Sequence, residues 1–375
     1  MTLTVIHSIL GTKLVMVGIR TGNSSFCPAI EYNNKPYGEN LRFIDNTFRC
    51  ADLFVAFNVK FDLHWLRRYG VLPPVTIWDC QYAQYCIWRQ KRAFPSLDQS
   101  LEYWGFPLKL DVVKTEYWEK GIDTDQVPEP VLKEYLEGDL LRTQWVFEAQ
   151  MKYLEDKPEL YKLIVLGNAD LLVTQEMEWN GFYYDNQASI KKGLELEAEI
   201  ADIDVRLCSF FHSIPCDWNS NDFVSAALYG GVVKEVYREQ YERVLKSGEV
   251  KLKERWSTRE HQLPTLVEPL KGTELAKAGY YSTDEDTLIK IADKGGKKVK
   301  TIVMLLLHRS KIEKLKSTYY LGLPKLYESK FWTDDIYHPQ LNSCVTRTGR
   351  IASQKPNEQN IPDEVRQLII SSYPS

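Results

Sequence analysis

Residues 346–362 read Thr-Arg-Thr-Gly-Arg-Ile-Ala-Ser-Gln-Lys-Pro-Asn-Glu-Gln-Asn-Ile-Pro, and the Gly, Pro and Asn residues of this polar stretch are typical of turns between short strands. Four of its side chains carry cationic or neutral hydrogen-bond donors, namely Arg350, Asn357, Gln359 and Asn360. The minor groove of a nucleic-acid duplex presents acceptors in nearly equivalent places for every base pair, so such donors can hold a duplex without reading its sequence. Arg347 and Lys355 are predicted to contact phosphates. A polar loop that caps a sheet is the alternative interpretation.

The composition is that of an ordinary globular protein. The chain has 375 residues, of which 44% are hydrophobic and 26% charged, and its length favours two or three domains. No apolar run reaches the roughly 18 residues of a membrane span, so we expect a cytoplasmic protein with no membrane partner. The seven cysteines form no Cys-x-x-Cys pair and are predicted to be reduced.

Charge is distributed unevenly along the chain. The net charge is −4, but residues 297–362 carry 12 Lys and Arg against 5 Asp and Glu. A basic region in an otherwise acidic chain suits a polyanionic partner held along one part of the molecule. From charge alone, the basic residues could equally well form a solvated helix face that binds no polyanion.

Two kinds of secondary structure follow one another along the sequence. Strand-like runs at 14–19 and 53–57 alternate with helical segments such as 61–69 and 130–153, which predicts a sheet covered by helices. From residue 160 onward the pattern is mostly helical. Long helices are predicted at 159–179, 187–211 and 300–320, and residues 236–283 are predicted to be irregular, with a hairpin turn near 246–248.

Three side chains in the first part of the chain have the chemistry of phosphodiester hydrolysis. Asp62 begins a helix after a buried strand, and Tyr135 and Asp139 lie one helical turn apart on one face. In two-metal hydrolysis, carboxylates hold two divalent cations roughly 4 Å apart while a hydroxyl group orients the attacking water. The motif at Asp62 and the motif at Tyr135 and Asp139 are each weak evidence for such a site. Their order, their separation and their positions after strands and on helices make the pair stronger evidence than either motif alone.

This half of the sequence resembles the 3′–5′ exonuclease domain of family A DNA polymerases, which belongs to the ribonuclease-H-like superfamily. Residues 57–66 match its second motif and carry Asp62; residues 135–139 match its third, with Tyr135 and Asp139. Residues 78–80 and 95–97 match its "W-D-T" and "S-L" segments. The resemblance implies that Asp62 and Asp139 are catalytic metal ligands and that Tyr135 orients water.

The first motif of that family, an Asp-x-Glu on the opening strand, has no counterpart here. No Asp precedes Asp45, and the opening strand is either missing or replaced by residues 3–9. Two dications held by two carboxylates are electrostatically unfavourable. We therefore expect little or no exonuclease activity, and Mg²⁺ or Mn²⁺ as cofactor only where an exonuclease site or an assembled polymerase site is functional. A start site placed too far downstream is the competing explanation.

The polar stretch at residues 346–362 also resembles a segment of this family. Residues 346–362 closely match its palm segment "T-x-T-G-R-L-S-S-x-x-P-N-L-Q-N-I-P", with Glu358 in place of the usual Leu. Residues 176–185 and 281–286 match segments that precede the palm, in the family's order. Residues 308–319 match its thumb helix, and the resemblance implies that three cations of this region contact phosphate: Arg309, Lys314 and Lys316.

The resemblance implies three parts. These are a ribonuclease-H-like α/β exonuclease domain at 1–160 without its first motif, a mainly helical thumb at 161–335 with an irregular insertion at 236–283, and the first strands of an incomplete palm sheet at 336–375. The family's catalytic Asp residues and nucleotide-binding fingers follow the segment matched by 364–366. We therefore expect part of a DNA polymerase that binds primer–template DNA and needs a second polypeptide for synthesis. A truncation, a stand-alone exonuclease and a non-catalytic DNA-binding remnant are the alternatives.

Overall fold

The computed structural model describes residues 2–7, 13–32, 35–36, 38–72, 76–108, 112–211, 214–244, 250–330 and 332–371. Contacts divide the chain into two compact units, which are described separately. Unit 1 comprises Met1–Tyr183, Ile336–Ile361 and Ser371–Ser375, and unit 2 comprises Tyr184–Asp335 and Pro362–Ile370. In the described residues, no helix has both the length and the apolar character needed to cross a membrane.

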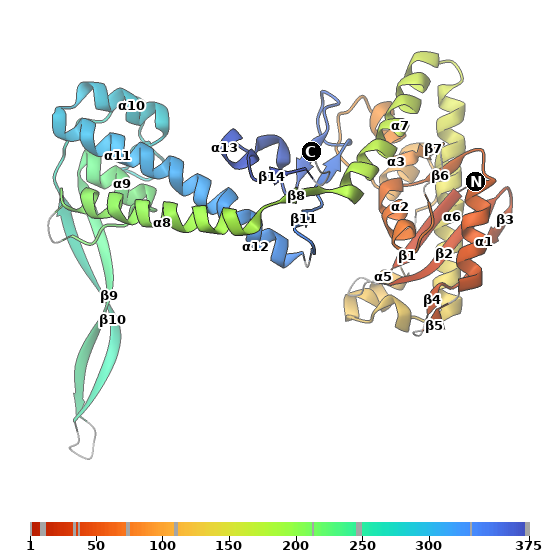
Figure 1. The fold of residues 1–375 in the computed structure, drawn as a ribbon, viewed down its shortest axis with the longest axis horizontal. Helices are drawn as coiled ribbons and strands as arrows, with labels where there is room; N and C mark the ends of the chain where they lie inside the picture. The colour runs from red at the N-terminus through yellow and green to blue at the C-terminus, as the bar shows by residue number, and fades with distance from the viewer. Residues whose placement is uncertain are drawn as a thin grey trace. The chain divides into compact units, whose positions relative to one another are not determined.

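Unit 1 is built on a mixed five-stranded sheet (Figure 1). Its strands, in spatial order, are β3 (Ser24–Phe26), β2 (Leu14–Thr21), β1 (Thr2–His7), β6 (Phe54–Ala56) and β7 (Ile77–Asp79). β1 is antiparallel to β2 and parallel to β6. The strands predicted at 14–19 and 53–57 are confirmed, and a strand also occupies the opening position at Thr2–His7.

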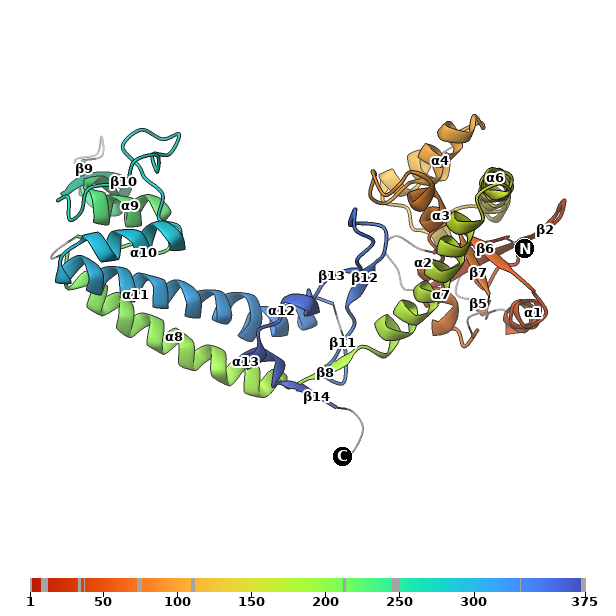
Figure 2. The same ribbon diagram turned by 90° about the horizontal axis from the view of Figure 1, so that it is seen from above.

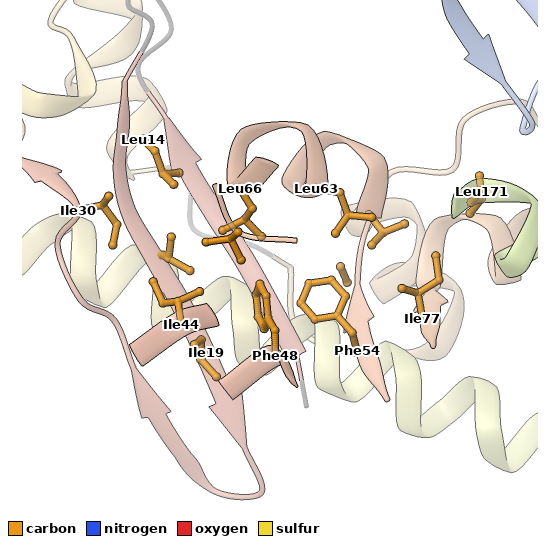
Figure 3. Packing of buried hydrophobic residues seen from close by; sticks show 14 residues of the cluster. Leu14, Ile19, Ile30, Ile44, Phe48, Phe54, Leu63, Leu66, Ile77 and Leu171 are labelled. Carbon is orange, nitrogen blue, oxygen red and sulfur yellow. The ribbon is translucent and has the colours of Figure 1, made fainter. Parts of the chain in front are cut away.

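Seven helices are described in this unit. They are α1 (Gly38–Arg49), α2 (Val59–Arg68), α3 (Cys80–Ile87), α4 (Leu97–Trp104), α5 (Val112–Glu116), α6 (Glu129–Leu154) and α7 (Pro158–Asn180). β2 is buried along most of its length because helices cover the sheet, as its unbroken apolar sequence predicts. Figure 3 shows the cluster in which Leu14 and Phe54 of the sheet pack with Leu63 of α2 and Leu171 of α7.

Close packing of α6 on β2 depends on Gly18. A Cβ added at Gly18 would lie 2.7 Å from Cγ of Leu136 and 2.8 Å from Cδ1 of Leu140. Both leucines are fully buried in α6. The missing side chain therefore sets the distance between this strand and the helix that carries Tyr135 and Asp139.

Short elements complete unit 1. β8 (Phe182–Tyr184) pairs through Phe182 and Tyr183 with β11 (Ile336–Tyr337), and β12 (Gln340–Asn342) pairs with β13 (Ala352–Gln354) ahead of the 3-10 turn η4 (Glu358–Asn360). A small β4 (Glu31–Tyr32) and β5 (Lys35–Pro36) hairpin and two 3-10 turns, η1 (Trp118–Lys120) and η2 (Thr124–Gln126), lie elsewhere in the unit. Of residues 336–375, which the resemblance assigns to the palm, residues 336–361 cluster in the same unit as Met1–Tyr183.

Unit 2 is mainly helical, as expected for this region. Its elements are α8 (Asn186–Cys208), α9 (Asn221–Tyr229), α10 (Glu285–Lys294), α11 (Lys297–Lys314), the π-helical turn η3 (Leu315–Tyr320), α12 (Gly322–Ser329), α13 (Asp363–Arg366) and the short strand β14 (Ile369–Ile370). Figures 1 and 2 both show α8 and α11 side by side. Asp284 caps α10, since it accepts a hydrogen bond from the backbone N–H of Thr287 at 2.8 Å.

A long hairpin occupies much of the segment that was predicted to be irregular. β9 (Gly231–Val244) and β10 (Val250–Leu263) form a two-stranded antiparallel ribbon that extends away from the helices of unit 2 (Figure 1). Cross-strand pairs stabilise it: Arg255 donates to Glu239 at 2.9 Å, and the guanidinium of Arg238 lies over the ring of Trp256. The expected turn at 246–248 lies outside the described residues, but the hairpin itself is confirmed and the irregular assignment up to residue 263 is wrong.

Candidate nucleic-acid interface

Residues 340–361 of unit 1, which we call the donor segment, expose the side chains that the sequence singled out. All six predicted duplex contacts are exposed: Arg347, Arg350, Lys355, Asn357, Gln359 and Asn360. At the two ends of the segment, Leu341, Cys344 and Ile361 are buried. The donor segment therefore has an apolar inner side and an outer side rich in N–H donors.

Hydrogen bonds within the donor segment determine its shape. Gly349, at φ 73°, closes a turn in which its N–H donates to the carbonyl of Thr346 at 3.0 Å. The hydroxyl of Ser353 donates to the carbonyl of Pro356 at 3.0 Å, and Gln359 Nε2 donates to the carbonyl of Ile351 at 3.0 Å. These bonds hold the strand and turn backbone from which the exposed donors project.

The donor segment is fastened to the helices of unit 1. Cys344 is buried in a cluster with Cys86 of α3 and Leu101 of α4. The N–H of Phe94 donates to the carbonyl of Cys344 at 3.0 Å, and the hydroxyl of Tyr85 donates to the carbonyl of Thr346. Its inner side is thus part of the same core as the α/β sheet.

A buried carboxylate adds charge-assisted hydrogen bonds to these attachments. Glu178 Oε1 accepts hydrogen bonds from Lys60 Nζ and from the N–H of Leu341, each at 2.6 Å. Its Oε2 lies 2.7 Å from Nε2 of His64. Burial by itself raises the pKa of Glu178, but the hydrogen bond with His64 and the positive charge of Lys60 outweigh it and lower the pKa below its ordinary value.

Sequence reasoning missed this cluster. The i, i+4 spacing of Lys60 and His64 on one helix face was visible, but Glu178 is more than a hundred residues away from both. Only the packing of α2 against α7 brings the three side chains together.

The exonuclease-like residues are carried by two helices. Asp62 lies in the first turn of α2 and Asp139 in α6, and their residues are only 4% and 6% exposed. Tyr135 is half-buried one turn before Asp139. Both helices pack against β1 and β6.

The start of α2 is fixed by another carboxylate. Asp79 accepts hydrogen bonds from the backbone N–H groups of Asn58 and Val59, at 3.2 and 3.0 Å, and also caps α3. Burial raises its pKa, against the lowering effect of these backbone donors. Asp79 is therefore a structural residue that orients the helix of Asp62.

These residues do not fit a two-metal centre. Among the residues with described side chains, no group of three or more His, Cys, Asp or Glu could hold a metal ion. β1, the strand in the opening position, has the sequence Thr-Leu-Thr-Val-Ile-His and carries no carboxylate. Two dications require more negative charge than Asp62 and Asp139 provide.

The predicted phosphate contacts of unit 2 differ in their surroundings. Lys314 is exposed, and Lys316 forms an ion pair with Glu313 at 3.0 Å. Arg309 is 7% exposed, and its guanidinium bonds to Asp204 at 2.5 and 3.1 Å. Its remaining contacts are Asn219 Oδ1 at 3.1 Å and the carbonyl of Trp218 at 3.4 Å. Arg309 therefore joins α11 to α8 inside unit 2.

Known proteins resemble this chain in fold and in sequence. The POL domain of Pol1 from M. smegmatis, solved in complex with DNA primer-template and dNTP, is similar in fold, with a TM-score of 0.67 at 17% sequence identity over 98% of this chain and 53% of that one. Residues 238–373 match the sequence model of DNA polymerase family A. Over these residues the chain is thus similar in sequence to family A DNA polymerases.

Relatives in sequence agree with this relation. The DNA polymerase of Bacillus phage SP01 is 25% identical over 394 residues, covering 96% of this chain and 40% of the phage protein. DNA polymerase I of Bacillus subtilis (strain 168) is 27% identical over 262 residues, covering 68% of this chain and 24% of that protein. The chain has a bacteriophage homologue and spans less than half the length of these curated relatives.

Proposed function

We propose that this chain is the exonuclease-like, thumb and first palm part of a DNA-directed DNA polymerase, and that its donor segment binds the primer–template duplex. The observation that carries the proposal is the arrangement of the donor segment: six predicted contacts are exposed on a backbone that is anchored in the core. The family match over residues 238–373 and the phage homologue support it.

The chemistry of the donor segment suits a duplex of any sequence. Arg350, Asn357 and Gln359 offer N–H donors, and the minor-groove acceptors of the four base pairs occupy nearly the same places. Arg347 and Lys355 add positive charge for phosphates. A template-directed enzyme requires a grip of this kind, because it must hold every sequence that it copies.

Substitution of Arg350 tests the proposal. At fixed salt, Arg350→Ala should weaken primer–template binding by about 1–3 kcal/mol, roughly 5- to 150-fold, in a fluorescence-anisotropy titration. Arg68→Ala, which removes an exposed arginine on α2 of the same unit, is the matched control and should leave affinity nearly unchanged. Equal affinities of the two variants would count against the groove role of Arg350.

Salt dependence separates groove contacts from phosphate contacts. Loss of one phosphate contact lowers the slope of log K against log salt by about 1. Arg347→Ala and Lys355→Ala should therefore each flatten this slope. Asn357→Ala should weaken binding without flattening it.

Synthesis also needs fingers and palm carboxylates, which the resemblance places after residues 364–366. The exposed residues of the donor segment would present the duplex to that catalytic centre.

A further inference from the structure

The helix that carries Asp62 also carries two polar side chains, those of Lys60 and His64, that contact a different part of the molecule. Lys60 and His64 lie one turn apart on one face of α2, whereas Asp62, two positions from each, points in another direction around the helix. Both side chains contact Glu178, which also accepts the N–H of Leu341. The carboxylate of Glu178 thereby connects α2 to the first strand of the donor segment.

Hydrogen bonds to backbone carbonyls also join these helices to the region of the donor segment. Lys60 Nζ also donates to the carbonyl of Leu341, so both backbone groups of this residue are bound. Nδ1 of His338 donates to the carbonyl of Glu178 at 2.9 Å. Gly181, at φ 64°, lets the chain approach closely, because a Cβ there would lie 2.4 Å from the carbonyl oxygen of Tyr337.

We propose that Glu178 is a positioning residue for duplex binding, holding the donor segment at a fixed place on the exonuclease-like helices α2 and α7. This inference rests on the proposed function of the donor segment. In this arrangement the helix of the second exonuclease motif serves the duplex-binding surface through Lys60 and His64, independently of any hydrolysis by Asp62.

The physical reason is preorganisation. The exposed donors reach the duplex from a short segment with few buried side chains, so their positions depend on the points where the backbone is attached. Glu178 makes charge-assisted hydrogen bonds in a mostly buried setting, with its side chain 10% exposed and that of Lys60 13% exposed. Weakening this attachment allows the donors to sample other positions and adds an ordering cost to binding.

Two glutamates of α7 provide a matched test. Glu176 also forms an ion pair with α2, through Arg67, but its other hydrogen bond goes to Asn180 on its own helix and not to the donor segment. Glu178→Gln should weaken primer–template affinity about tenfold, as expected for losing charge-assisted hydrogen bonds. Glu176→Gln should change affinity less than twofold.

Amide hydrogen exchange of the protein without DNA distinguishes a loosened donor segment from a general loss of stability. In Glu178→Gln, amides of residues 340–361 should exchange faster, while those of β2 and β6 keep their protection. Uniform loss of protection would show general destabilisation and overturn the proposal. Equal effects of the two glutamate substitutions on affinity would overturn it as well.

A milder variant covers the case in which Glu178→Gln does not fold. Tyr85→Phe removes only the hydroxyl that donates to the carbonyl of Thr346, and it should weaken DNA binding about threefold with faster exchange near that residue. If Arg350→Ala weakens binding while Glu178→Gln and Tyr85→Phe do not, the positioning role is refuted and the duplex-binding role stands. If the wild-type chain binds no duplex, the proposed function itself fails.

Discussion

A substitution of Arg309 tests whether this cation stabilises the fold or binds DNA. The family resemblance assigns it a phosphate contact, but its guanidinium lies inside unit 2, with its side chain 8% exposed. Arg309→Met keeps the length and apolar stem of the side chain while it removes the charge. We expect this substitution to lower the stability of unit 2 and to affect DNA binding only through that loss.

The magnitude follows from the contacts. Removing one partner of a buried ion pair typically costs about 3–5 kcal/mol, because the other charge remains buried without compensation. The side chain of Asp204 is 32% exposed, so water can partly solvate it, and we expect a value near the lower limit, about 3 kcal/mol. For a domain of about 150–250 residues this corresponds to a lower unfolding temperature by roughly 6–12 °C.

Thermal unfolding followed by circular dichroism measures this change, with DNA affinity measured well below the transition. Lys314→Met, an exposed lysine on the same helix, is the control and should change stability by less than about 0.5 kcal/mol. An Arg309→Met protein with unchanged unfolding temperature but a salt slope flattened by about 1 would refute the structural role. That result would instead support a contact between Arg309 and a phosphate.

Three further predictions concern unit 1. Gly18→Ala should destabilise the chain by about 1–3 kcal/mol in urea unfolding, because the new Cβ would overlap Leu136, whereas Gly38→Ala, with nothing within 4 Å of its Cβ, should not. Glu178 has a folded pKa below its ordinary value of 4.5, so its stabilising contribution is present above that pH and lost as the pH falls through the lowered pKa. Four titratable groups lie close to it: Lys60, His64, His338 and Glu358. The unfolding temperature of Glu178→Gln should therefore fall less steeply with acid than that of the wild type, and parallel curves would contradict this. The purified chain should show little or no Mg²⁺-dependent 3′–5′ degradation of single-stranded DNA, and degradation at a normal rate, abolished by Asp62→Asn, would disprove the expected deficiency.

Local patterns predicted the parts of the fold that are stabilised by burial. The apolar run at 14–19 is a buried strand, and the long amphipathic segments are helices that end where turn residues occur, as at Asn180. The sequence indicated a hairpin but not the two long strands β9 and β10, because β10 is exposed along most of its length and shows no periodic pattern of buried apolar residues. The regularity of this ribbon depends on cross-strand pairs such as Arg255 with Glu239, which exist only in the correct register.

The sequence by itself determined the α/β and helical halves and the polar donors of residues 346–362, since these depend on residue type and local spacing. Only the tertiary structure decided that Arg309 is an internal ion-pair partner and that Glu178 joins α2 to Leu341. The role of a charged side chain depends on which partners and how much water surround it, and distant segments of the chain supply both.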